Sequence, residues 1–385
     1  MTRASPGLPH CVHPAPLALA LPAPTVGFLG IRIGEQCMFR SAFCLHRVLA
    51  PAALSLLLAA CAGDEGMTNV ATLPDEPDPP VCPVPPPEGL AGAPLTLATF
   101  TIDGIGVYST RDNEALACLV EPYDLVVVHD LGAPPYPGTF GDGEAYRPAQ
   151  PAANFFDAMR RHGFDYVMAP EDTGHVPTNK LNSGLTVWPV TFYKPNRVRL
   201  AQDRPSGYID PDRTANPNYD RVPFALAFVT ADGRYDFYVV SVNLAEGREK
   251  ASRRRFELGA LTGWLSQFAS SERDVFVSGG FDFNDCSEVA GNLPPILIAV
   301  DDGCQATNIS NKRPTAGWLV LRGATAALAG EPVVLDVIRE MQSFWVYKYG
   351  AGYPGEPLNY GLFAQTYSGH KPVILGVVPP AGDED

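Results

Sequence analysis

From Leu95 onward, short apolar runs alternate with turn residues. Seven of these runs are four to eight residues long, the length of buried strands, and each is bounded by Gly, Pro, Asp or Asn. The predicted strands cover residues 97–102, 125–128, 185–192, 224–229, 237–242, 274–277 and 318–321.

Two segments instead repeat apolar residues at three- and four-residue spacing, which predicts helices over 152–161 and 253–268. Hairpin-like strand pairs mixed with helical connections indicate the α/β class with mixed sheets. The chain has 385 residues, of which 46% are hydrophobic, so it can bury a large core. One main globular domain is expected over residues 95–380.

A different pattern, basic residues followed by an apolar run, precedes the strands. Arg40, His46 and Arg47 come before the apolar run 48–60, which is shorter than the roughly 20 residues of a membrane-spanning helix. The pattern predicts a signal peptide over 38–60, beginning at Met38. Residues 1–37 show no periodicity and would place the basic region in mid-chain, so we expect that the start codon is assigned too early.

The apolar run ends in Leu58-Ala59-Ala60-Cys61, which resembles a bacterial lipobox. The small residues would admit a signal peptidase, and the Cys61 thiol would then carry a diacylglycerol. The alternative is an ordinary signal peptide with a chance cysteine. Ala62 follows, as in Gram-negative lipoproteins sent to the outer membrane. We therefore expect export across the inner membrane and a lipid anchor at the outer membrane, in the periplasm or at the cell surface.

The segment 61–94 is dominated by Pro, Asp and Glu, which predicts a stiff, extended tether between the anchor and the domain.

Without residues 1–60 the chain has 24 basic and 41 acidic residues, a formal net charge of −17. Nucleic-acid binders usually present a basic stripe, so DNA or RNA is disfavoured as a partner. The basic run Arg253-Arg254-Arg255 is interpreted as a solvated helix face. The pattern names no protein or small-molecule partner.

Four cysteines follow the predicted anchor, and an even number in an oxidising compartment suits two disulfides. Cys286 with Cys304 is the first expected pair. Cys82 with Cys118 would tie the tether to the domain, unless Cys118 is simply a buried thiol.

Short motifs at the strand ends carry a family resemblance. In chain order they are Thr99-Phe100-Thr101-Ile102, Val127-Val128-His129-Asp130, Ser241-Val242-Asn243-Leu244, Gly279-Gly280-Phe281-Asp282-Phe283-Asn284 and Ser368-Gly369-His370-Lys371-Pro372-Val373. This series resembles the endonuclease/exonuclease/phosphatase superfamily. The resemblance implies a deoxyribonuclease I-like α/β fold: a four-layered sandwich of two mixed β-sheets with outer helices and an active site at one end. Mg²⁺ or another divalent cation is implied if the chain is active.

The metal-binding positions of that family are altered. Thr101 stands where the resemblance expects an asparagine. Asp130 stands at the position of a metal-ligating glutamate and is the metal-ligand candidate. Its side chain is one methylene shorter, and Mg²⁺ holds its oxygen ligands at about 2.0–2.1 Å, so direct ligation would need a backbone shift.

Both histidine–carboxylate dyads of the family are also altered. Asn243 replaces one histidine, and Val187 lies where its carboxylate partner is expected. An amide cannot do acid–base work near neutral pH, which leaves Asn243 as a substrate-binding candidate. His370 is retained as a catalytic candidate, but Gly369 and Ala316 replace the aspartates beside it. An imidazole without a carboxylate to orient it is a weak base.

The motif Gly-Asp-Phe-Asn allows two registers. Without a gap, Gly280 and Asp282 occupy its Asp and Asn positions; with a two-residue insertion, Asp282 and Asn284 restore the motif on one strand face. The second register is favoured, with Asp282 and Asn284 as catalytic candidates. Arg221 matches an arginine that faces phosphate in the family and is the phosphate-binding candidate, the alternative being a surface arginine at a strand start.

One set of positions therefore lacks the expected groups: Thr101, Val187, Asn243, Ala316, Gly369 and, in shortened form, Asp130. The favoured hypothesis is a catalytically impaired pseudoenzyme that acts as a binding or scaffolding module at the cell envelope. The alternative is a divalent-metal-dependent phosphodiesterase, phosphatase or nuclease with a site rebuilt from Asp130, Asp282 or Asp285 and His370. A third possibility is a structural lipoprotein.

Overall fold

The computed structural model describes residues 79–90, 92–140, 143–173, 187–211, 216–268, 272–299, 305–321, 328–350 and 359–380. The chain divides into the units Met1–Ala71 and Thr72–Asp385, and every described residue belongs to the second. The predicted signal peptide, the lipidation site Cys61, most of the tether and Cys304 lie outside the described residues.

One six-stranded sheet has the order β14-β15-β1-β2-β6-β5. β1 and β2 are parallel, and the other neighbours are antiparallel. Its strands are β1 (Leu95–Ile105), β2 (Leu125–Leu131), β5 (Asp165–Met168), β6 (Val190–Tyr193), β14 (Val333–Val334) and β15 (Val373–Val377).

The second sheet has seven strands in the order β12-β13-β11-β10-β9-β7, with β8 also paired to β9. Here β10 and β11 form the parallel pair. The strands are β7 (Val198–Leu200), β8 (Gly207–Tyr208), β9 (Phe224–Thr230), β10 (Asp236–Asn243), β11 (Val275–Gly280), β12 (Leu297–Ala299) and β13 (Ala316–Leu321); β3 (Gly138–Thr139) and β4 (Ala145–Tyr146) form a separate hairpin.

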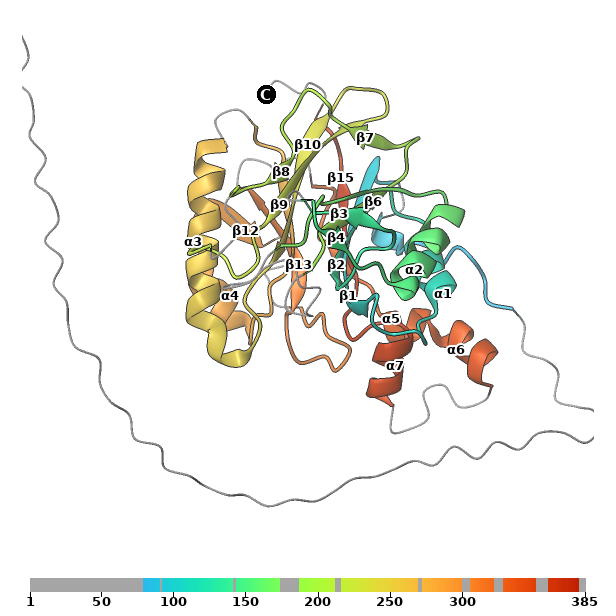
Figure 1. Cartoon of the computed structure of the whole chain (residues 1–385). Helices are drawn as coiled ribbons and strands as arrows, with labels where there is room; N and C mark the ends of the chain where they lie inside the picture. The colour runs from blue at the N-terminus through green and yellow to red at the C-terminus, as the bar shows by residue number, and fades with distance from the viewer. Residues whose placement is uncertain are drawn as a thin grey trace, which may run out of the picture. The chain divides into compact units, whose positions relative to one another are not determined.

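Helices cover the two outer faces (Figure 1). On the side of the second sheet lie α3 (Ala251–Phe268) and α4 (Cys286–Asn292). On the side of the first sheet lie α1 (Asn113–Val120), α2 (Gln150–Arg161), α5 (Val337–Glu340), α6 (Gln342–Tyr349) and α7 (Tyr360–Thr366). The 3-10 turns are η1 (Glu88–Leu90) and η2 (Arg248–Lys250).

Strand alternation distributes the core over three layers. On β2, Val126 and Val128 pack toward the helices α1 and α2, whereas Leu125 and Val127 pack between the two sheets. Successive side chains of a strand point to opposite faces, so each central strand serves two cores. The predicted deoxyribonuclease I-like class, two mixed sheets face to face with helices outside, is confirmed.

All the predicted strands and both predicted helices are present, with shifted bounds. The run 185–192 is the largest difference: in its described part, 187–192, the strand β6 starts only at Val190, and Val187 precedes it in an irregular segment. The largely apolar α1 and the C-terminal strand β15 were not anticipated. Among the described helices, none has both the length and the apolar character to cross a membrane.

The disulfide that joins the tether to the domain is confirmed. Cys82 pairs with Cys118 of α1, with 5.5 Å between the Cα atoms. Cys286 is also disulfide-bonded, and its expected partner Cys304 lies outside the described residues.

Candidate functional site

The candidate residues gather where the ends of the central strands meet. The parallel pairs β1–β2 and β10–β11 run so that Thr101 lies opposite His129 and Asn243 lies opposite Gly280. Because β13 and β15 are antiparallel to their neighbours, their first residues come to the same end. We call this region the sandwich end.

A hydrogen-bonded chain crosses the sandwich end from the first sheet to the second. The Asn243 amide donates from Nδ2 to Asp130 Oδ1 at 2.6 Å, and its Oδ1 accepts from Arg221 Nη1 at 3.3 Å. Arg221 also forms an ion pair with Glu246 at 2.9 Å, and its side chain is 7% exposed. The predicted metal ligand, Asp130, and the two predicted substrate-binding residues are therefore brought together, but they satisfy one another.

Asp130 has an unusual backbone conformation and a carboxyl group whose pKa is raised. Its φ is 69°, in the left-handed region that aspartate tolerates better than most residues, at the point where the β1–β2 register shifts. Burial raises the pKa of the Asp130 carboxyl, the nearby Glu246 raises it further, and Arg221 opposes both. The site thus favours a less charged carboxyl than an exposed aspartate would be.

His370 has a carboxylate partner that the sequence patterns did not reveal. Asp103, on β1, places Oδ1 3.1 Å from His370 Nε2, and Thr315 Oγ1 lies 2.8 Å from His370 Nδ1. The expectation that the imidazole has no orienting carboxylate is therefore wrong. The reason is that the carboxylate comes from another strand. Both ring nitrogens are engaged within the protein, and the His370 side chain is 21% exposed.

Gly369 makes room for this partner. The Gly369 N–H donates to Asp103 Oδ2 at 3.0 Å, and a Cβ at this position would lie 2.4 Å from the same oxygen. Burial by itself lowers the pKa of His370, but the hydrogen bond and the charge of Asp103 outweigh it and the pKa is raised. Burial tends to raise the pKa of Asp103, and the hydrogen bond and charge of His370 lower it overall.

The Gly279–Asn284 motif starts inside β11 and ends beyond it. β11 pairs with β10 and β13 without interruption through Gly280, and Asp282 and Asn284 follow the strand end. The favoured register, with Asp282 and Asn284 as site residues, stays a prediction. A Cβ at Gly280 would face Asn243 Oδ1 at 3.4 Å and Thr101 Oγ1 at 3.9 Å. A carboxylate at this position would enter the sandwich end, and glycine leaves it without one. Thr101 Oγ1 is buried and has no hydrogen-bond partner among the described residues.

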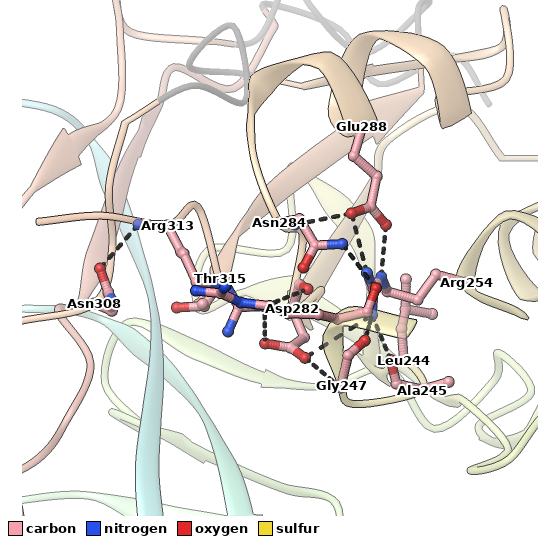
Figure 2. Close-up of polar contacts among 12 residues, drawn as sticks. Leu244, Ala245, Gly247, Arg254, Asp282, Asn284, Glu288, Asn308, Arg313 and Thr315 are labelled. Atoms are coloured by element: carbon pink, nitrogen blue, oxygen red, sulfur yellow. Dashed lines mark hydrogen bonds and ion pairs between the residues drawn. The ribbon is translucent and has the colours of Figure 1, made fainter. Parts of the chain in front are cut away.

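Asp282 and Asn284 lie beyond the strand end, and the Asp282 carboxylate lies between Gly247 and Arg313 (Figure 2). Asp282 accepts from the Gly247 N–H at 2.7 Å and from Arg313 Nη2 at 2.8 Å. Asn284 donates from Nδ2 to the Arg248 carbonyl at 3.1 Å. Asp282 is close enough for its charge to raise the pKa of His370, whereas Asn284 holds a loop together.

Arg254 supports this loop from inside. Its side chain is fully buried and pairs with both Glu288 oxygens, at 2.7 and 3.0 Å, while Nη1 donates to the carbonyls of Ala245 and Gly247 (Figure 2). The prediction of a solvated face is thus wrong for Arg254. A run of three arginines gave no sign that one of them turns inward.

The residues of the sandwich end do not fit a bound Mg²⁺. Such an ion takes several carboxylate or water oxygens in a near-octahedral arrangement. One oxygen of Asp130 accepts an amide N–H, the Arg221 guanidinium lies behind that amide, and Asp103 and Asp282 are committed to other donors. In the described part of the chain, three possible ligand atoms converge at Cys82, Glu121 and His162, which are elsewhere.

Three functional partners escaped the sequence patterns: Asp103, Glu246 and Arg313. Asp103 carried a usable signal, because it lies two residues after Thr101 and period-two alternation puts both on one strand face. Glu246 and Arg313 lie outside the strands, where no periodicity indicates direction.

Comparisons with known proteins give fold-level likenesses. No family model matches the sequence, and no curated protein matches it. The human Nocturnin catalytic domain with bound sulfate is 13% identical, with a TM-score of 0.47, over 74% of this chain and 95% of that chain. A humanized D. rerio TDP2 is 15% identical, with a TM-score of 0.44, over 73% and 97%.

An endonuclease/exonuclease/phosphatase family protein from Bacteroides thetaiotaomicron is 12% identical, with a TM-score of 0.45, over 74% of this chain and 98% of that chain. At such identities and scores the likeness carries no information about activity.

Proposed function

We propose that the chain is an envelope lipoprotein whose endonuclease/exonuclease/phosphatase-like domain no longer hydrolyses phosphoesters and instead acts as a binding or scaffolding module. One observation supports this most: each charged group at the sandwich end has a partner inside the protein. Asp130 faces an amide, Arg221 faces Glu246, His370 faces Asp103, and Asp282 faces Arg313.

Metal-assisted hydrolysis needs the opposite arrangement. It requires oxygens that point at one cation, and a base with a free lone pair near the attacking water. His370 has both ring nitrogens engaged, and Asn243 has no proton that titrates near neutral pH. Substrate would have to displace these internal contacts before either group could act.

The decisive experiment is a hydrolysis assay of the full chain with Mg²⁺, Mn²⁺ or Ca²⁺ against bis-nitrophenyl phosphate, DNA and sphingomyelin. His370→Ala and Asp130→Asn are assayed beside the wild type. We expect the wild type to show no metal-dependent turnover above that of the two variants. Turnover that needs a divalent ion and disappears in both variants would exclude the pseudoenzyme.

The alternative function, a phosphoesterase with a rebuilt site, draws on the Asp103–His370 pair. A carboxylate that orients a histidine is a common catalytic arrangement. In that case Asp103→Asn would lower kcat by at least tenfold while leaving KM nearly unchanged. If no activity exists to be lowered, the pair is structural.

The anchor is tested separately from the chemistry. Expression in a Gram-negative host with labelled palmitate should give a labelled, membrane-associated chain, and Cys61→Ser should abolish both. The prediction of a lipoprotein fails if wild type and Cys61→Ser carry equal label or fractionate alike.

A further inference from the structure

Three ligand-type atoms converge far from the strand-end motifs, at the ends of two helices that cover the first sheet. Cys82 lies in the segment before η1, Glu121 directly follows α1, and His162 directly follows α2. Cys82 Sγ is 3.5 Å from Glu121 Oε2 and 3.9 Å from His162 Nδ1, and these last two atoms are 2.6 Å apart. We call these three residues the Cys82 corner.

The spacing is close to that of a tetrahedral zinc site. Zn²⁺ binds cysteine sulfur at about 2.3 Å, histidine nitrogen at about 2.0–2.1 Å and carboxylate oxygen at about 2.0–2.2 Å, so its ligand atoms lie roughly 3.3–3.8 Å apart. Both separations from the sulfur are near this range. Only the Glu121–His162 contact has to open, by less than 1 Å, because it is a hydrogen bond that an ion would replace.

The histidine is oriented for such a role. Its second nitrogen, Nε2, lies 3.3 Å from Glu114 Oε2 on α1. Nδ1, the atom that faces Cys82 and Glu121, gives up its proton when an ion replaces the hydrogen bond to Glu121, and Glu114 then holds the remaining proton on Nε2. Metal-bound histidines commonly have this kind of outer carboxylate.

The corner is accessible. Cys82 is exposed, and a cleft of about 600 Å³ is lined by Cys82, Cys118, His162 and Glu114, together with Tyr347 and Lys348 of α6. A small reductant and a metal ion can both reach the sulfur. The Cys82–Cys118 disulfide, however, removes the thiolate that would bind the metal.

We propose that Cys82, Glu121 and His162 form a redox-controlled Zn²⁺ site that is closed by the disulfide and opened by reduction. A dithiol reductant gives two electrons and two protons to the disulfide and becomes a disulfide itself, leaving thiols at Cys82 and Cys118. Zn²⁺ then binds the Cys82 thiolate, His162 Nδ1 and the Glu121 carboxylate, the protons of the Cys82 thiol and of His162 Nδ1 pass to solvent, and water fills the fourth position. The ion would replace the disulfide as the clamp between the tether and α1 and α2.

The test uses Co²⁺ as a spectroscopic probe and Zn²⁺ competition with a chromogenic chelator, on the full chain. Wild-type protein is measured as purified, and again after dithiothreitol treatment and anaerobic desalting. We expect a thiolate-to-Co²⁺ charge-transfer band only in the reduced sample. After the same treatment, Cys82→Ala should bind one metal equivalent fewer than the reduced wild type.

Cys118→Ala separates the metal site from the redox step. It destroys the disulfide but keeps all three ligands, so it should bind Zn²⁺ without reductant. In this background His162→Gln and Glu121→Gln should each weaken binding at least tenfold, Glu114→Gln by about tenfold, and the exposed control Glu249→Gln not at all.

Two results would overturn the proposal. In the first, adding His162→Gln to Cys118→Ala leaves the Zn²⁺ affinity unchanged. In the second, reduced wild type and reduced Cys82→Ala give the same binding curve. The second comparison also decides the question if Cys118→Ala, a change at a buried residue, does not fold.

Discussion

The sandwich end and the Cys82 corner contain similar residue types in opposite arrangements. At the sandwich end, three carboxylates each face a different group of the protein: Asp130 faces Asn243, Asp103 faces His370, and Asp282 faces Arg313. At the Cys82 corner, a sulfur, a nitrogen and an oxygen point at one another. A cation is held where several lone pairs converge, and not simply where acids are numerous. The number of acidic residues in a region is therefore a weaker guide to a metal site than the convergence of their oxygens.

The difference also has an electrostatic cause. Buried charges are costly unless they are paired, so a cluster of charged side chains that holds no cation is stable only if its charges find internal partners. Glu246 and Arg313 supply such partners for Arg221 and Asp282. The predictions below test how firmly each region depends on these contacts.

The largest effect is expected for Arg254→Met at the sandwich end. The change leaves Glu288, whose side chain is 8% exposed, without its buried cation, and removal of one partner from a buried pair costs about 3–5 kcal/mol. Urea denaturation measures the loss. Arg234→Met is the control, because Arg234 is 83% exposed, and little change is expected there. Equal effects of the two substitutions would mean that Arg254 is not a structural cation.

Breaking the covalent clamp at the Cys82 corner should cost somewhat less. Cys82→Ser opens a disulfide between residues 36 apart in sequence, for which about 2–4 kcal/mol of unfolding free energy is typical. Wild-type protein in reductant and metal chelator should show at least this loss, because the disulfide of Cys286 is reduced as well. If the free energy of unfolding is unchanged in both samples, the segment around Cys82 does not contribute to global stability.

A smaller loss is expected from Gly369→Ala. The added Cβ would lie 2.4 Å from Asp103 Oδ2 and push that carboxylate away from His370, at a cost of about 1–3 kcal/mol. The matched control is Gly291→Ala in α4, where a Cβ meets nothing within 4 Å and alanine favours the helix. A crystal structure or histidine NMR spectrum of Gly369→Ala with an intact Asp103–His370 pair would contradict this interpretation.

The smallest effect is the pH dependence of the Asp103–His370 pair. The folded pKa of His370 is raised, so its contribution is complete below the unfolded value of about 6.5 and is lost as pH rises through the folded pKa. The folded pKa of Asp103 is lowered, so its contribution is present above about 4 and is lost as pH falls through the folded pKa.

The pair therefore stabilises most between about pH 4 and 6.5. Asp103 is 38% exposed, so solvent screening limits the effect of Asp103→Asn to about 1 kcal/mol or less. Denaturation at pH 5.5 and 8.5 should show a larger difference from wild type at the lower pH. NMR titration should place the pKa of His370 lower in the variant. A difference that grows toward pH 8.5 would have the wrong sign.

Much of the architecture could be predicted from local pattern. Apolar runs located the central strands, three- and four-residue spacing located α2 and α3, and the strand-end motifs indicated which ends would meet. α1 was missed because it is apolar on nearly every side: six of its eight residues are buried, so it shows no polar face. The irregular segment before β6 was predicted as strand because its residues are apolar, although residues 187–189 belong to no strand.

The sequence by itself determined which positions of the sandwich end lack a titratable group, because Asn243 and Gly280 have none wherever the chain places them. Only the tertiary structure decided which groups replace them as partners. Asp103 contacts Gly369 and its neighbour His370, although Gly369 and Asp103 are 266 positions apart in the chain. Cys82 and His162, which also lie close together, are 80 positions apart. Hydrogen bonds and ion pairs depend on distance and direction in space, and a one-dimensional pattern records neither.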